Sequence, residues 1–156
     1  MSVLALRPLM PDDAGAAHAL VTAAFAGTRY LARFAEQLDA ALRFDDPEYL
    51  AVLAERDARL VGLALFGTVA GARGCTRLHL LAGGDGDATD ALAEGVAQVC
   101  HDARERLIVA ELADEPVFAA GADALRRAGF AVEGRAGDYV ADGVDLVLLV
   151  WRPRRD

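Results

Sequence analysis

The sequence predicts an α/β protein with one central sheet of about seven strands, mostly antiparallel, and with helices on both faces. Segments with helical spacing of apolar residues alternate with short runs rich in Val, Leu and Phe. Hydrophobic residues make up 54% of the chain, which favours a well-filled core. With 156 residues and no repeat or low-complexity linker, the chain suits a single domain over residues 1–156.

The first third of the chain predicts one strand and two helices. Residues 2–7 alternate enough to form a strand, which Pro8 terminates. Apolar residues then recur at helical spacing over 14–26 and again over 30–43. The Asp-Asp-Pro run at 45–47 ends the second helix.

Three strands are predicted next, over 49–55, 60–69 and 75–82. Their connections are short and polar, which is typical of an antiparallel meander. A glycine-rich loop follows, then a helix over 88–105 and a buried strand over 107–112. Because a whole helix connects the last two of these strands, we expect them to be parallel.

The chain closes with a helix and two strands. The helix is predicted over 116–129, with proline in its first turn and glycine at its end. The strands at 130–135 and 144–151 are expected to pair around a turn at Asp142-Gly143.

Composition argues against several classes of partner. The formal net charge is −8, and nucleic acid or an anionic membrane would need a basic face. No apolar run reaches the roughly 18 residues of a membrane span, and no secretory signal pattern opens the chain, so a cytoplasmic protein is expected. All 16 basic residues are Arg, so lysine chemistry is impossible. Cys75 and Cys100 are interpreted as small buried hydrophobes, and no metal is expected.

Local motifs near the C-terminus follow one another in a recurrent order: a helix ending in Gly-Phe, an acidic glycine-bearing strand, an Asp-Gly turn and an apolar last strand. The residues are Gly129-Phe130, Glu133-Gly134-Arg135, Asp138-Tyr139 and Asp142-Gly143. With the opening LRPLMPDDA, this order resembles the GNAT N-acetyltransferase superfamily over essentially the whole chain. The resemblance implies a GNAT-like fold, acetyl-CoA or another acyl-CoA as co-substrate, and a small-molecule or peptide amine as acceptor.

In the family that the chain resembles, the fourth strand and the loop after it bind coenzyme A. Carried onto this sequence, the binding residues are Leu81, Ala82, Gly83, Gly84, Gly86, Asp87, Ala88 and Thr89. The family signature is Arg or Gln, two residues, Gly, one residue, then Gly or Ala. Here Gly84 stands at the first position, Asp87 at the second and Thr89 at the third, so the signature is degenerate.

The glycine-rich loop is also acidic, since it carries Asp85, Asp87 and Asp90 and no Arg. Three interpretations remain open. Asp87 can cap the following helix with Asp90 in its first turn, both stabilised by the helix dipole. Alternatively the loop binds the coenzyme diphosphate through backbone N–H groups despite its carboxylates. The third possibility is a cation, although neither calcium-loop pattern fits completely.

Two residues are candidates for catalysis. The resemblance implies a base on the fourth strand, at about the position of His79, and imidazole is chemically suited to that task. Glu111, in an otherwise apolar strand, is the second candidate. The family's acid Tyr is replaced by Leu125 and its coenzyme-contacting Asn by Phe118, while Tyr139 either substitutes for the acid or packs.

Two functions therefore stay open. One is an N-acyltransferase that moves an acyl group from acyl-CoA to an amine. The other is a catalytically degenerate GNAT-fold module that binds a ligand or a partner. The apolar strand at 145–151 could pair across a homodimer or be buried within one chain.

Overall fold

The structure is a computed structural model that describes residues 2–154. Its strands form one seven-stranded sheet with the order β1-β2-β3-β4-β5-β7-β6. The strands are β1 (Leu4–Pro8), β2 (Leu50–Arg56), β3 (Arg59–Val69), β4 (Ala72–Gly83), β5 (Leu107–Ala113), β6 (Ala131–Ala141) and β7 (Val144–Trp151). Only β4 and β5 pair in parallel, and α3 connects them. The predicted fold class and this parallel pair are confirmed.

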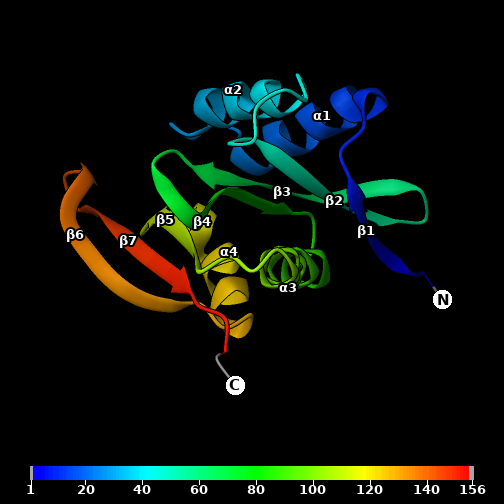
Figure 1. The fold of residues 1–156 in the computed structure, drawn as a ribbon. Helices are drawn as coiled ribbons and strands as arrows, with labels where there is room; N and C mark the ends of the chain where they lie inside the picture. Colours follow the sequence, from blue (N-terminus) through cyan, green and yellow to red (C-terminus); the bar gives the residue numbers. More distant parts are fainter. Residues whose placement is uncertain (1, 155–156) are drawn as a thin grey trace.

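Helices cover both faces of the sheet (Figure 1). They are α1 (Ala14–Phe25), α2 (Leu31–Ala41), α3 (Gly86–Asp102) and α4 (Pro116–Arg127), with a 3-10 turn η1 (Pro11–Asp13) before α1. The first two helices bury Val21, Phe34 and Leu38 against one face, and the last two bury Leu92 and Leu125 against the other. The sheet therefore separates two hydrophobic cores, because each face must be covered.

The last hairpin differs from its predicted bounds. We expected the first of its strands to end at residue 135, and β6 continues to Ala141. Its register with β7 shifts beyond Ala136, and Asp138 has a positive φ of 54°. Side-chain hydrogen bonds hold this irregular stretch: Asp138 N–H donates to Asp145, and Gly143 N–H donates to Asp138. Such local bonds hold a polar, glycine-bearing segment at the sheet edge, where the register pairing with β7 is interrupted.

Cys75 and Cys100 are both buried, as predicted, and burial raises the pKa of each thiol. Within residues 2–154, no helix has the length and apolar character to cross a membrane.

Candidate active site

The strand β4 departs from both of its neighbours at His79. Leu78 and Leu80 pair with adjacent residues of β3, so His79 between them has no partner and forms a β-bulge. On the other side, the pairing with β5 ends at Leu78 opposite Ala110. Beyond this point β4 and β5 diverge, so one edge of β4 lacks a strand partner.

A pocket of about 260 Å³ lies beside this divergence. Its lining includes Tyr30, Arg33, Phe34, His79, Glu111 and Tyr139. The fold thus brings His79 of β4 and Glu111 of β5 to one pocket, together with Tyr139 of β6. These three residues are far apart in the sequence, and only the sheet order makes them neighbours.

The imidazole of His79 is held in one orientation. Its Nε2 lies 2.8 Å from the carbonyl oxygen of Glu48, and its ring stacks on Tyr49 with centroids 4.9 Å apart. Because a carbonyl only accepts hydrogen bonds, Nε2 carries the proton and the lone pair resides on Nδ1. Burial lowers the pKa of His79 below its ordinary value, against the opposing effect of the Glu48 hydrogen bond. The ring is therefore neutral at neutral pH.

Gly67 of β3 leaves space for the Glu48 carbonyl, which accepts the hydrogen bond from His79. The segment before β2 crosses β3 here, and Thr68 N–H donates to the carbonyl of Pro47 at 3.0 Å. A Cβ atom at position 67 would lie 2.1 Å from the carbonyl oxygen of Glu48. Only glycine permits this approach, so Gly67 determines where the Glu48 carbonyl meets the imidazole.

Tyr30 lines the pocket, although the sequence offered no motif for it. Its hydroxyl donates to the carboxylate of Glu115, which Arg29 also contacts at 3.1 Å. Burial, reinforced by this carboxylate, raises the pKa of Tyr30 to about 12. The hydroxyl is thus protonated and already engaged at neutral pH. No local pattern could reveal the contact, because 85 residues separate the partners.

The space between the diverging strands is filled by apolar side chains. A void of only about 10 Å³ remains there. Phe118 of α4 projects into it and joins an aromatic cluster on the opposite face, with ring centroids 4.8 Å from Tyr30 and 5.8 Å from Phe25. Leu125, at the position of the family's acid, is fully buried. Among the residues that the structure describes, Phe118 lines both this void and the 260 Å³ pocket, so its ring lies between the two.

The glycine-rich loop turns into α3 one residue after Asp85. The carboxylate of Asp85 caps the helix by accepting from Ala88 N–H at 2.8 Å, and the prediction that Asp87 is the cap is wrong. The N–H of Gly84 donates to Val61, and that of Thr89 donates to the Asp85 carbonyl. Three amides that the resemblance assigned to the coenzyme thus have partners within the protein.

The acidic loop gains its counter-charges from other elements. Arg56 of β2 contacts Asp85 at 2.6 Å and Asp87 at 3.9 Å. The Ala88 amide and then Arg56 hold the pKa of the Asp85 carboxyl below its usual range. Asp90 lies beyond the first turn, contrary to prediction, and pairs with Arg127 of α4 at 2.7 Å. The loop itself carries no Arg, and the fold brings Arg56 and Arg127 to its carboxylates from other elements.

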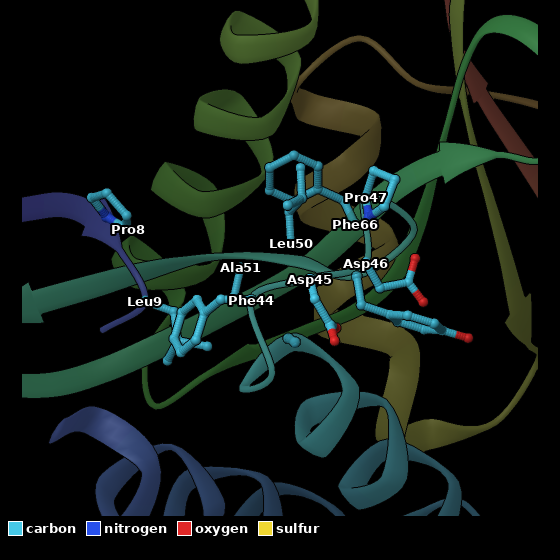
Figure 2. Close-up of a pocket in the computed structure, with 11 residues that line it drawn as sticks. Pro8, Leu9, Phe44, Asp45, Asp46, Pro47, Leu50, Ala51 and Phe66 are labelled. Atoms are coloured by element: carbon cyan, nitrogen blue, oxygen red, sulfur yellow. The ribbon is translucent and has the colours of Figure 1, made fainter. Parts of the chain in front are cut away.

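A second pocket, of about 560 Å³, lies between the α2–β2 connection and the end of β1. Figure 2 shows Pro8 and Leu9 toward one end of it and Asp46 and Pro47 toward the other, with the ring of Phe44 next to Leu9. It shares only an indirect contact with the first pocket, because its lining residue Tyr49 stacks on His79. In the described chain, no group of three or more His, Cys, Asp or Glu residues is arranged to hold a metal ion.

This arrangement of a seven-stranded sheet, a bulged β4 and diverging central strands is the GNAT fold. A GNAT-family protein from Desulfovibrio desulfuricans matches with a TM-score of 0.80 at 22% identity, covering 96% of this chain and 99% of that one. A ribosomal-protein-alanine N-acetyltransferase from Brucella melitensis matches at 0.74 and 18%, over 96% and 99% of the chains.

The protein yncA of Salmonella typhimurium, solved with its cofactor acetyl-CoA, matches with a TM-score of 0.75 at 14% identity, over 98% of this chain and 95% of that one. No protein-family model matches the sequence, and no curated protein does. At such identities the similarity establishes the fold, while the activity has to be argued from the site.

Proposed function

We propose that the protein is an N-acyltransferase that moves an acetyl or other acyl group from acyl-CoA to an amine. The observation that carries the proposal is the coincidence, at His79, of the β4 bulge, the divergence of β4 from β5 and the wall of a pocket. The GNAT fold supports the same reaction class, since structural neighbours are named as acetyltransferases.

The neutral imidazole of His79 takes the role of base in this proposal. Nδ1 accepts the proton that the acceptor ammonium must lose before its nitrogen attacks, while Nε2 stays bonded to Glu48. Glu111 contacts the cationic amine and orients it. Acyl-CoA supplies the activated thioester, whose C–S bond breaks as the amide forms. Tyr139, at the pocket wall, is the candidate donor of a proton to the departing sulfur, and the second proton that the nitrogen loses as the amide forms restores its hydroxyl.

The β4 edge and the loop before α3, where acyl-CoA would bind, fit that donor only in part. From Leu81 to Gly83, the edge of β4 that faces β5 lacks a strand partner and suits the amides of a pantetheine arm. The diphosphate, however, must compete with the Asp85 carboxylate for the N–H of Ala88. The apolar side chains that fill the space between β4 and β5, among them Phe118 and Leu112, must also move aside for the arm to enter. We therefore assign Leu81, Ala82 and Gly83 to the arm, and Gly84, Gly86, Asp87, Ala88 and Thr89 to a loop that rearranges around the diphosphate.

The filled gap favours a second candidate function. If Phe118 stays in the aromatic cluster, no acyl donor reaches the pocket, and the protein is a degenerate GNAT-fold module that binds a ligand without transferring a group. Phe118 contacts three aromatic rings, which favours its staying in place.

Calorimetric titration with acetyl-CoA separates the two candidates. The proposal expects binding by the natural chain and tighter binding by Phe118→Leu, because a smaller side chain opens the gap. Phe25→Leu is the matched control, since it thins the same cluster at a similar cost of about 1 kcal/mol without lining the gap. If neither the natural chain nor Phe118→Leu binds millimolar acetyl-CoA, the degenerate module is the correct reading.

The role of His79 is tested by turnover. Once an acceptor is found, His79→Ala should lower kcat by about 100-fold or more while acetyl-CoA affinity stays within about twofold. An unchanged kcat removes His79 from the base role.

A further inference from the structure

Two charged side chains without ion-pair partners line the 260 Å³ pocket. Arg33 projects from α2, and Glu111 projects from β5. Within residues 2–154 neither forms a salt bridge or a side-chain hydrogen bond, whereas Arg29, one turn before Arg33, is paired with Glu115. The two charges are also too far apart to pair with one another. A cation and a carboxylate thus face one small pocket from different elements.

The rest of the lining adds little charge. His79 is neutral at neutral pH, since burial lowers the pKa of its imidazole, and the nearby charge of Arg33 acts in the same direction. The Tyr30 hydroxyl is engaged by Glu115. The remaining surface comes largely from apolar side chains, among them Phe34, Leu112 and Leu146. A ligand that matches this pocket carries one positive group, one negative group and an apolar body.

The volume restricts the ligand further. Small-molecule pockets usually span about 300 to 1,000 Å³, and this one lies just below that range. It suits a molecule of amino-acid size rather than a long peptide. A simple cationic amine would be attracted by Glu111 but repelled by Arg33, whereas a molecule with both charges satisfies both groups.

We propose that the acceptor is a free amino acid or a related small aminocarboxylate, whose ammonium group binds Glu111 near His79 and whose carboxylate binds Arg33. This inference rests on the proposed function, because it names the acceptor class of the same pocket. The guanidinium fork suits a carboxylate through paired N–H donors. The ammonium then lies on the side of the pocket where His79 can take its proton.

The test is binding without acyl-CoA, so that it does not depend on transfer. Calorimetry compares leucine and 6-aminohexanoate, which separate their two charges by different lengths. Each is compared with its amide, which lacks the carboxylate, and with its des-amino acid, which lacks the ammonium. We expect at least one amino acid to bind about tenfold or more tighter than both of its single-charge analogues.

Variants assign each charge to its partner. Arg33→Gln should weaken the amino acid and the des-amino acid about tenfold and leave the amide unweakened, and Glu111→Gln should weaken the amino acid and the amide instead. Arg59→Gln and Glu36→Gln make the same charge changes at exposed sites outside the pocket and should change no affinity.

Three results would overturn the inference. The first is an amide that binds as tightly as its amino acid, which would point to a peptide N-terminus. The second is equal weakening of every ligand by Arg33→Gln. The third is absence of binding by all the probes. Acyl transfer to amides alone would preserve the proposed acyltransferase function and remove the amino acid as its acceptor. Amino-acid binding without acetyl-CoA binding would preserve the amino-acid site and remove the acyltransferase function.

Discussion

At the residue scale, His79 joins the architecture of the protein to its proposed chemistry. It is the extra residue of the β4 bulge, it donates to Glu48 and it stacks on Tyr49. A histidine satisfied in this way could be purely structural. Its place on the pocket wall, with Nδ1 free of any hydrogen bond within the described residues, is what gives it a chemical role.

The burial of His79 predicts how stability depends on pH. The pKa of the imidazole is lower in the folded state than its ordinary 6.5, so below about pH 6.5 the unfolded chain takes up the proton more readily. The free energy of unfolding should therefore fall as pH falls through this region, and the effect should vanish above it. His79→Gln keeps an amide donor for Glu48 but does not titrate.

Urea unfolding at about pH 7.5 and about pH 5.5 measures this effect. The midpoint of the natural chain should fall more between the two values than that of His79→Gln, because other titrating groups are common to both proteins. Equal falls would show that the imidazole is not desolvated.

The close approach at Gly67 predicts the effect of a substitution there on stability. Gly67→Ala places a methyl group against the Glu48 backbone, which cannot move away as a flexible side chain could. We expect a loss of about 1 to 3 kcal/mol in the free energy of unfolding. Gly15→Ala, in α1 with no atom within 4 Å of the new Cβ, should instead be neutral or stabilising by roughly 0.5 to 1 kcal/mol. Equal effects in thermal unfolding would contradict the close approach.

At the element scale, the N-terminus of α3 decides whether the loop can hold a diphosphate. Asp85 caps the helix. The negative charges of Asp85 and Asp90 are balanced by Arg56 and Arg127, which come from other elements. The same arginines are available to an anion if the carboxylates release them. Two arginines therefore lie beside the loop, and the loop's own carboxylates occupy them.

Asp85→Ser tests this point. Serine retains the capping function, while removal of the carboxylate frees Arg56 and reduces repulsion of the diphosphate. We expect acetyl-CoA to bind roughly three- to tenfold tighter by calorimetry. Asp87→Ser makes the same charge change at a side chain that is 89% exposed and should have a smaller effect. An equal gain in both variants would indicate long-range charge rather than competition at the amide.

Element positions were largely predictable, whereas the local geometry at their ends was not. Apolar periodicity placed the four α-helices, because burial of one face requires it, and runs rich in Val, Leu and Phe placed the central strands, whereas the 3-10 turn η1 was not predicted. The choice of Asp85 over Asp87 as cap depends on where β4 releases the chain. The continuation of β6 to Ala141 depends on bonds between Asp138 and Asp145, which neither hairpin strand specifies alone.

At the scale of the whole molecule, the sheet joins two cores of different composition. The α1–α2 side contains the aromatic cluster, and the α3–α4 side contains mainly Leu, Val and Ala. Phe118 belongs to α4 yet packs in the aromatic core, and it lines the small void beside Leu81 of β4 and Leu112 of β5. The two cores are therefore coupled at the proposed route of the acyl donor.

Sheet position predicts the distribution of local stability. Leu63 and Leu65 of β3 are fully buried between two strand neighbours, whereas Tyr139 and Val140 lie on the edge strand β6 without a register partner on β7. Amide hydrogen exchange should be at least about 100-fold faster at Tyr139 and Val140. Similar protection at both places would mean that the pocket wall formed by β6 is as rigid as the sheet centre.

The sequence alone determined the element order and the fold class, because periodicity and residue chemistry act locally along the chain, and the family resemblance added His79 as a catalytic candidate beside Glu111. Only the tertiary structure decided that His79 and Glu111 share a pocket with Arg33, that Arg56 and Arg127 neutralise the acidic loop, and that Phe118 fills the gap. These relationships join residues tens of positions apart. They depend on strand register and sheet order, which arise from the packing of the whole chain rather than from any one segment of it.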